Sequence, residues 1–379
     1  MVLAFERGSY TKGLIMHSSH HSSYSSPSSR ELSALGWDET FAAMFAEHAA
    51  AGLLPARIAR VDRGRCDTLT ASGPVRADSS ALSGVDREQM VCTGDWVALR
   101  PGPQPHVVAV LPRRTAITRA SSDRTSHRQV LAANVDTVVI AVSLAAPVNA
   151  GRIERLLALT FDSGARPIIV LTKADLAEHA GADEAEVAAL APGVDILTTS
   201  AATGVGLEQL AAAVTGTAVL LGPSGAGKSS LANALLGRER MDTNEVREVD
   251  GKGRHTTVHR ELLALPAGGV LIDTPGLRGI GVQDVADGVE QVFAEIEAYA
   301  RNCAFGDCEH RSEPECAVQD AVVTGELDLG RLERYRKLMR ESQWAATRGD
   351  ARQSGKRSKT VKAITRDLRA TYRFRDRQR

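Results

Sequence analysis

The chain has 379 residues, of which 43% are hydrophobic and 24% are charged, and its 46 basic residues balance its 46 acidic ones. This length suggests about two or three domains, and the composition is globular, with enough apolar residues for buried cores. The richest apolar stretch, residues 135–148, is interrupted by Asp136 and Ser143, and the N-terminus lacks the apolar run of a secretory signal. These features exclude a membrane-spanning or secreted chain, so we expect a cytoplasmic protein.

The two ends of the chain differ in composition from its centre. Residues 1–30 are rich in Ser and His, which predicts a disordered leader, and a short helix over residues 32–47 completes a segment 1–52. Residues 351–379 contain eleven Lys and Arg but only two Asp, a balance of +9 that leaves −9 for the rest of the chain. This basic tail indicates a polyanionic partner, although a solvated tail without a partner fits the same composition.

Residues 53–113 have the pattern of a small closed β-barrel, for which an OB-fold is one candidate. About five short strands are expected there, including 57–61, 66–70, 95–99 and 107–111, with Gly- and Pro-containing turns between them. Arginines recur, as an oligonucleotide-binding barrel requires, at Arg57, Arg60, Arg63, Arg65 and Arg76. A purely structural barrel is the alternative. Cys66 and Cys92 are expected to be buried within it.

Residues 114–285 alternate between buried strand patterns and helical patterns, which predicts an α/β domain with a mainly parallel sheet. The expected strands are 137–143, 167–171, 196–198, 218–221 and 270–272. The expected helices are 152–163, 183–190, 206–213 and 229–236. Residues 286–350 are expected to form a mostly helical domain, in which helices 291–301 and 329–347 flank a cysteine cluster.

A complete P-loop pattern, G-x-x-x-x-G-K-[ST], follows the expected strand 218–221 and precedes a helix. It consists of Gly222, Pro223, Ser224, Gly225, Ala226, Gly227, Lys228 and Ser229, and Ser230 comes next. The glycines let backbone N–H groups surround phosphates, and the helix N-terminus adds its positive dipole end. We expect Lys228 to reach the β- and γ-phosphates and the Ser229 hydroxyl to bind Mg²⁺.

The D-x-x-G pattern formed by Asp273 and Gly276 follows the apolar strand 270–272. Alone it is a common turn sequence, but after a P-loop and a buried strand it is typical of a γ-phosphate sensor. The Asp273 carboxylate could hold Mg²⁺ directly or through water, and the Gly276 N–H could contact the γ-phosphate.

The segment Thr172-Lys173-Ala174-Asp175 resembles the guanine-specificity motif [NT]-K-x-D. A carboxylate at Asp175 can accept hydrogen bonds from guanine N1–H and its 2-amino group, whereas adenine offers neither. The Lys173 stem can cover the base. The alternative is that Asp175 is an ordinary helix N-cap. After the next strand, Ser200 and Ala201 resemble the second base-contacting loop, with the Ala201 N–H available to guanine O6.

The order of these motifs is unusual, because the base-binding motifs precede the P-loop, whereas conventional GTPases have them after it. A site is a spatial arrangement, so joining the old termini and opening the chain elsewhere preserves it. The sequence therefore predicts a circularly permuted GTPase domain.

With these motifs, residues 35–338 resemble the ribosome small subunit-dependent GTPase A family. Further support comes from the barrel segment Gly94-Asp95-Trp96-Val97 and from Gly253-Arg254-His255-Thr256-Thr257. The resemblance implies an N-terminal OB-fold, a permuted GTPase domain and a C-terminal zinc domain. Thr172 stands where many GTPases have Asn, and the family tolerates both.

The water-orienting Gln of Ras-type enzymes is replaced here, because Leu277 follows Gly276. His255 is the candidate replacement, and a structural loop histidine is the alternative. One of Thr256 and Thr257 is expected to bind Mg²⁺ when GTP is bound, and we favour Thr257. Arg254 could supply positive charge or lie in solvent.

Three thiols and one imidazole fall within fourteen residues, at Cys303, Cys308, His310 and Cys316. Four such ligands satisfy tetrahedral Zn²⁺ and leave no open position, which predicts one structural zinc ion. Unligated cysteines are the alternative.

We expect a GTPase that hydrolyses GTP to GDP, binds the small (30S) ribosomal subunit and its rRNA, and acts in late assembly. A GTP-dependent RNA-binding switch in which hydrolysis is secondary is the alternative, and a P-loop ATPase or kinase is the third hypothesis. No DNA or membrane partner is expected, and the chain is expected to be a monomer.

Overall fold

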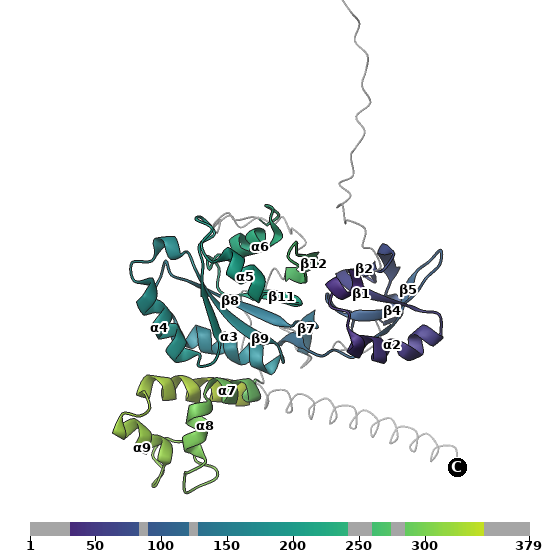
Figure 1. Ribbon diagram of the computed structural model, residues 1–379. Helices are drawn as coiled ribbons and strands as arrows, with labels where there is room; N and C mark the ends of the chain where they lie inside the picture. Colours follow the sequence, from purple (N-terminus) through teal and green to yellow (C-terminus); the bar gives the residue numbers. More distant parts are fainter. Residues whose placement is uncertain (1–30, 83–89, 121–127, 242–259, 274–284, 345–379) are drawn as a thin grey trace, which may run out of the picture.

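The computed structural model describes residues 31–82, 90–120, 128–241, 260–273 and 285–344. Figure 1 shows three parts: a barrel drawn in purple and dark blue, an α/β domain in blue to green, and a helical region in yellow-green beside it. The leader 1–30 and the basic tail 351–379 lie outside the described residues. No helix in the described part of the chain is long and apolar enough to cross a membrane.

Two short helices precede the barrel, α1 (Glu31–Ala34) and α2 (Glu39–Ala50). The single helix predicted over 32–47 is therefore wrong. The chain turns at Gly36, whose φ of +89° lies in the left-handed region that favours glycine. The Asp38 carboxylate then starts α2 by accepting a hydrogen bond from the Phe41 N–H at 3.0 Å.

Five strands form the predicted closed barrel, in the order β1-β2-β3-β5-β4. Every neighbouring pair is antiparallel except β3 with β5, which is parallel. They are β1 (Leu54–Asp62), β2 (Arg65–Thr70), β3 (Gly73–Asp78), β4 (Trp96–Arg100) and β5 (His106–Val110), with the 3₁₀ helix η1 (Ser80–Leu82) after β3. This is the five-stranded architecture of an OB-fold. Cys66 lies in the barrel core, and Cys92 is buried just before β4, as predicted.

A hairpin of β6 (Ala116–Ala120) and β7 (Arg128–Ala133) connects the barrel to a six-stranded sheet. The sheet strands are β8 (Thr137–Ser143), β9 (Arg166–Thr172), β10 (Asp195–Thr198), β11 (Thr217–Leu221), β12 (Glu261–Ala264) and β13 (Val270–Asp273). Their order is β10-β9-β8-β11-β13-β12, and every pair is parallel except β12 with β13. The prediction of a mainly parallel sheet is confirmed.

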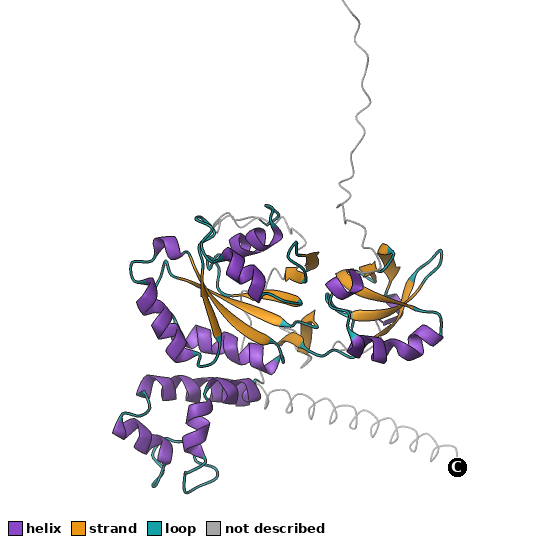
Figure 2. Cartoon of the chain, viewed as in Figure 1, coloured by secondary structure: helices purple, strands orange, loops and turns teal. Residues whose placement is uncertain are grey.

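Helices cover both faces of this sheet, as Figure 2 shows. Those on one face are α3 (Ala150–Asp162) and α4 (Ala180–Leu190), and those on the other are α5 (Leu207–Ala213) and α6 (Lys228–Leu236). Alternate residues of β8 reach the two sides: Val138 packs in the core with α3, and Val139 packs with α6. This explains why β8 is a continuous apolar run rather than an alternating one.

The C-terminal region is helical: α7 (Ala286–Val292), α8 (Ala294–Ala300), α9 (Ala317–Thr324) and a further helix over residues 329–344. The single helix predicted over 291–301 is wrong, because the chain bends at Phe293 between α7 and α8. The region is tied to α3 by buried Glu154, which accepts hydrogen bonds from Arg331 Nη1 at 2.9 Å and from Arg334 Nε at 2.8 Å. The α/β domain and the helical region therefore share a buried ion cluster.

Candidate nucleotide site and metal site

The predicted nucleotide motifs gather at one edge of the sheet. Parallel strands end at the same edge, and ligands of open α/β sheets bind outside those carboxyl ends. Thr172 ends β9, the loop after β10 carries Ser200, the P-loop follows β11, and Asp273 ends β13. The permuted order of the motifs along the chain is therefore compatible with one site.

The P-loop joins β11 to α6 through three glycines with positive φ: Gly222 at +144°, Gly225 at +77° and Gly227 at +81°. A Cβ at Gly222 would lie 2.6 Å from the Ala141 carbonyl oxygen, so a side chain there would displace β8 or the loop. Lys228 begins α6, and its Nζ donates hydrogen bonds to the carbonyl oxygens of Gly222 at 2.9 Å and Pro223 at 2.5 Å. The ammonium group therefore lies over the loop that would surround the phosphates, with Ser229 and Ser230 in the first turn of α6.

Thr172 lies behind the P-loop, with 3% of its surface exposed. Its hydroxyl donates a hydrogen bond to the Ala226 carbonyl oxygen at 2.9 Å. The same oxygen would lie 3.3 Å from a Cβ at Gly227, so the hydroxyl packs where a larger residue would place its side chain. The first residue of the base motif thus supports the phosphate loop directly, which its position in the sequence did not indicate.

The rest of the base motif meets the second base loop. Lys173 adopts φ +60°, and Ala174 and Asp175 lie in the 3₁₀ helix η2 (Ala174–Leu176). The Ser200 hydroxyl donates to Asp175 Oδ1 at 2.5 Å, whereas Ala201 is exposed. The helix N-cap alternative for Asp175 is wrong, because the N-cap positions of η2 and α4 are Lys173 and His179.

Asp273 lies at the end of β13, opposite Glu261 of β12. Burial, together with the nearby Glu261 carboxylate, raises the pKa of Asp273, while Arg240 acts against this shift. Both oxygens of Glu261 accept from Arg240 Nη2 at 2.9 Å. The other predicted groups of this site, His255, Thr257 and Gly276, lie outside the described residues, as do Arg254, Thr256 and Leu277.

The four predicted metal ligands converge. The ligand atoms of Cys303, Cys308, His310 and Cys316 all lie within 4.8 Å of one another. The measured separations are 3.6 and 3.8 Å between sulfurs, and 3.6 Å from His310 Nδ1 to two of the sulfurs. A tetrahedron with zinc–sulfur bonds of about 2.3 Å has sulfur–sulfur edges of about 3.8 Å and sulfur–nitrogen edges of about 3.6 Å. The donor set therefore fits a zinc ion in both chemistry and spacing.

Two neighbours of this cluster were missed in the sequence because their type and spacing carry no metal signal. Glu313 folds the loop, since its carboxylate accepts from the backbone N–H groups of Glu309, Arg311 and Ser312. Gln319 of α9 donates from Nε2 to the His310 carbonyl oxygen. Burial lowers the pKa of His310, which favours the neutral imidazole that metals bind.

The RsgA GTPase family profile matches residues 110–283. A protein of Streptomyces coelicolor named "Small ribosomal subunit biogenesis GTPase RsgA" is 56% identical over 343 residues, which cover 88% of this chain and 91% of that relative. The chain belongs to the RsgA GTPase family. It is a GTP-hydrolysing enzyme with an OB-fold barrel, a circularly permuted GTPase domain and a helical domain that carries the Cys₃His cluster.

A second relative and two solved structures agree with this assignment. A relative from Opitutus terrae with the same name is 44% identical, over 84% of this chain and 92% of its own length. The crystal structure of YjeQ from Thermotoga maritima superposes with a TM-score of 0.57 at 26% identity, over 76% of this chain and 98% of that one. The circularly permuted GTPase YloQ shares the fold, with a TM-score of 0.55.

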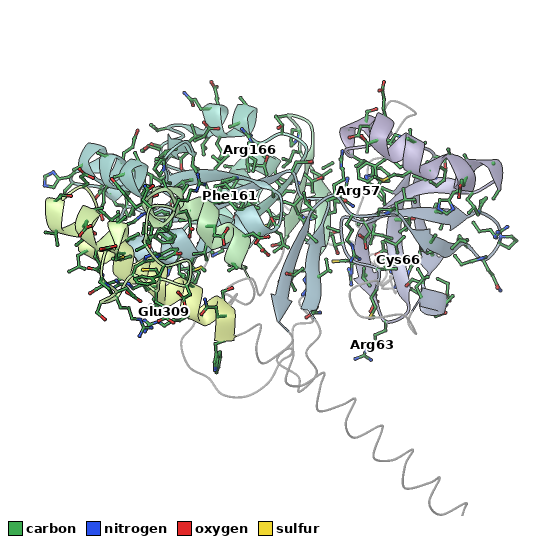
Figure 3. All side chains as sticks on the ribbon, turned by 90° about the horizontal axis from the view of Figure 1, so that it is seen from below. Arg57, Arg63, Cys66, Phe161, Arg166 and Glu309 are labelled. Atoms are coloured by element: carbon green, nitrogen blue, oxygen red, sulfur yellow. The ribbon has the colours of Figure 1, made fainter. Side chains whose placement is uncertain are left out.

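The five arginines predicted to suit an RNA-binding barrel do not share one environment in the structure. Arg57 is 1% exposed and faces the GTPase domain, so its assignment to an RNA surface is wrong. The charge of Arg76 is offset by Asp62 and Asp67, at 3.2 and 2.6 Å. Arg60 is half-buried, whereas Arg63 and Arg65 are exposed. Figure 3 shows Arg57 between the two domains and Arg63 projecting from the barrel.

Proposed function

We propose that this GTPase binds the small (30S) ribosomal subunit through rRNA, acts in its late assembly, and hydrolyses GTP faster when the subunit is bound. The supporting observation is that relatives named for small ribosomal subunit biogenesis match the barrel, the GTPase domain and the Cys₃His domain together, over 88% of this chain. We further propose domain boundaries at 1–52, 53–113, 114–285, 286–350 and 351–379.

In this proposal the P-loop binds the phosphates of GTP. Its N–H groups and Lys228 stabilise the negative charge that develops on the β- and γ-phosphates, while Asp175 selects guanine. Ser229 and Thr257 would hold Mg²⁺, which would supply positive charge against the phosphates, with Asp273 at the same edge. His255 would orient the attacking water, and Gly276 would contact the γ-phosphate. Thr172 and Ser200 would keep the two loops in place.

The RNA contact in this proposal is one rim of the barrel. Strand pairing places Arg65 opposite Asp78, Asp78 opposite His106, and His106 opposite Arg100. Arg63 lies in the adjoining turn, and Arg63, Arg65 and Arg100 are exposed. Three exposed arginines at this end of the barrel, with Asp78 as the one acidic residue among these pairs, suit phosphate contacts, which position a protein on RNA without reading its sequence. The basic tail would add further phosphate contacts.

The zinc ion would act structurally in this proposal. Cys303, Cys308, His310 and Cys316 would fill its four positions, so it would cross-link the loop between α8 and α9 rather than take part in hydrolysis. We also propose a cytoplasmic monomer whose nucleic-acid partner is RNA rather than DNA.

The test is GTP and ATP turnover by the purified protein, alone, with purified small subunits, and with large subunits as the matched control. The proposal predicts GTP turnover that only small subunits increase. GTP-dependent binding of small subunits without any increase in turnover would favour the regulatory switch. Equal turnover of ATP and GTP would contradict both.

A further inference from the structure

Arg57 connects the barrel to the GTPase domain through hydrogen bonds to distant parts of the chain. Its Nη1 donates to the Leu35 carbonyl oxygen at 2.7 Å, and its Nη2 donates to Thr217 Oγ1 at 2.9 Å and to the Asn134 carbonyl oxygen at 3.3 Å. The guanidinium carbon also lies 5.1 Å from the centre of the Trp96 ring. Thr217 is thus the GTPase-domain side chain that receives this barrel arginine.

The two partners stand on strands that lead to functional ends of the molecule. Arg57 is in β1, which runs to the turn that carries exposed Arg63, six residues later. Thr217 is the first residue of β11, which runs straight to Gly222 at the start of the P-loop. At about 3.3 Å per residue, these two spans are about 20 Å and about 16 Å.

Both ends of this connection are held firmly. β11 lies between β8 and β13 in the middle of the sheet, and the Thr217 N–H donates to Asp136 Oδ2 at 2.7 Å. On the barrel side, Gly36 leaves room for the guanidinium group, since a Cβ there would lie 3.0 Å from Arg57 Nη1. Burial lowers the pKa of Arg57 to about 10, against the favourable charge of Asp136 and Asp95, so it remains protonated at neutral pH.

A buried cation with three defined acceptors is costly to displace, because leaving its partners unpaired costs more than the bonds gain. Any shift of β1 relative to the sheet must therefore either carry Thr217 with it or break this contact. A packed contact that has two discrete arrangements can couple distant sites, because each site can favour one of the arrangements.

We propose that Arg57 is a positioning residue that links RNA binding at the barrel rim to the P-loop through the Thr217 hydroxyl. This inference rests on the proposed function, since it requires that the barrel binds the small subunit. Coupling between sites is reciprocal: if bound subunit changes the affinity for GTP relative to GDP, GTP changes the affinity for the subunit by the same factor. The ratio of subunit dissociation constants with GDP and with a non-hydrolysable GTP analogue therefore measures the coupling.

The test compares Thr217→Val, which keeps the volume but removes the acceptor, with Thr217→Ser, which keeps the hydroxyl. The matched control is Thr137→Val at the start of neighbouring β8, where the hydroxyl donates to the Thr215 carbonyl oxygen within the GTPase domain. For the wild type, we expect a ratio of about 5 to 150, the usual range of allosteric coupling. We expect Thr217→Val to lower this ratio at least threefold, and Thr217→Ser and Thr137→Val to preserve it. Turnover without subunits should stay close to wild type in all three, whereas Thr217→Val should lower the thermal unfolding midpoint because a buried Arg57 N–H loses its acceptor.

A second variant, Arg57→Lys, keeps the charge but loses the forked donors, and it should lower the ratio like Thr217→Val. The double variant Arg57→Lys/Thr217→Val should show no further decrease in the ratio of subunit dissociation constants. A Thr217→Val ratio equal to that of wild type, or a wild-type ratio of one, would overturn the inference while leaving subunit binding intact. Absence of subunit binding by the wild type with either nucleotide would overturn the proposed function and this inference together.

Discussion

Thr172→Val provides a direct test of the contact between the base motif and the P-loop. The substitution keeps the side-chain volume at a site that is 3% exposed, and it removes the hydroxyl that donates to the Ala226 carbonyl oxygen at 2.9 Å. A net hydrogen bond of this kind contributes about 0.5–1.5 kcal/mol. In the wild type the loop is held in place before nucleotide binds, whereas in the variant part of the binding free energy must order it.

We therefore expect Thr172→Val to weaken GDP and GTP binding about 2- to 13-fold, the range that corresponds to about 0.5–1.5 kcal/mol. Titration of a fluorescent guanine nucleotide in the presence of Mg²⁺ measures both dissociation constants. Thr172→Ser is the control, because it retains the hydroxyl and should bind like the wild type. Equal affinities for the Val and Ser variants would refute the positioning role of this hydroxyl.

Three further predictions concern the metal, the domain contact and the tail. Purified, unchelated protein should contain one zinc ion per chain by metal analysis, and Cys308→Ala should lower that content; protein free of zinc would refute the site. Glu154→Gln should reduce the free energy of unfolding in urea by about 3 kcal/mol, because it removes the buried carboxylate shared by buried Arg331 and half-buried Arg334, while Arg331 keeps its ion pair with Glu295; a decrease below about 1 kcal/mol would contradict this. Deleting residues 351–379 should leave basal turnover intact but weaken small-subunit binding. The slope of binding affinity against salt concentration should become shallower, by about 0.7–0.9 log units per decade of salt for each phosphate that the tail neutralises. An unchanged salt titration would show that the tail binds no phosphate.

The sequence predicted the features that local patterns encode. Each of these features has a residue spacing that fits one local geometry: the P-loop, the buried strands β8, β9, β11 and β13, and the four metal ligands. The structure forms the strands where they were predicted and brings the four ligand atoms together. Strand β3 was missed because it starts with Gly73 and Pro74, which are typical of a turn. The breaks at Gly36 and Phe293 were missed because the apolar periodicity continues across both of them.

Contacts between distant segments could not be predicted in the same way. Arg57 lies between apolar residues in a strand, and nothing nearby distinguishes a solvent-facing arginine from one whose partner, Thr217, is 160 residues away. Thr172 and Glu154 are similar cases, since their roles depend on Ala226 and Arg331, which only folding brings close. Sequence patterns thus predicted the candidate nucleotide and metal sites, whereas the contacts that position their residues required the structure.

The most direct test of a subunit-stimulated, guanine-specific site is xanthosine triphosphate turnover by Asp175→Asn with purified small subunits. The amide suits the 2-oxo group of xanthine and loses the bonds that a carboxylate accepts from guanine, and xanthosine triphosphate excludes signal from other GTPases in the subunit preparation. We predict that the variant loses GTP turnover and gains xanthosine triphosphate turnover that small subunits increase. Undiminished GTP turnover by the variant, or no response of its xanthosine triphosphate turnover to small subunits, would contradict the account.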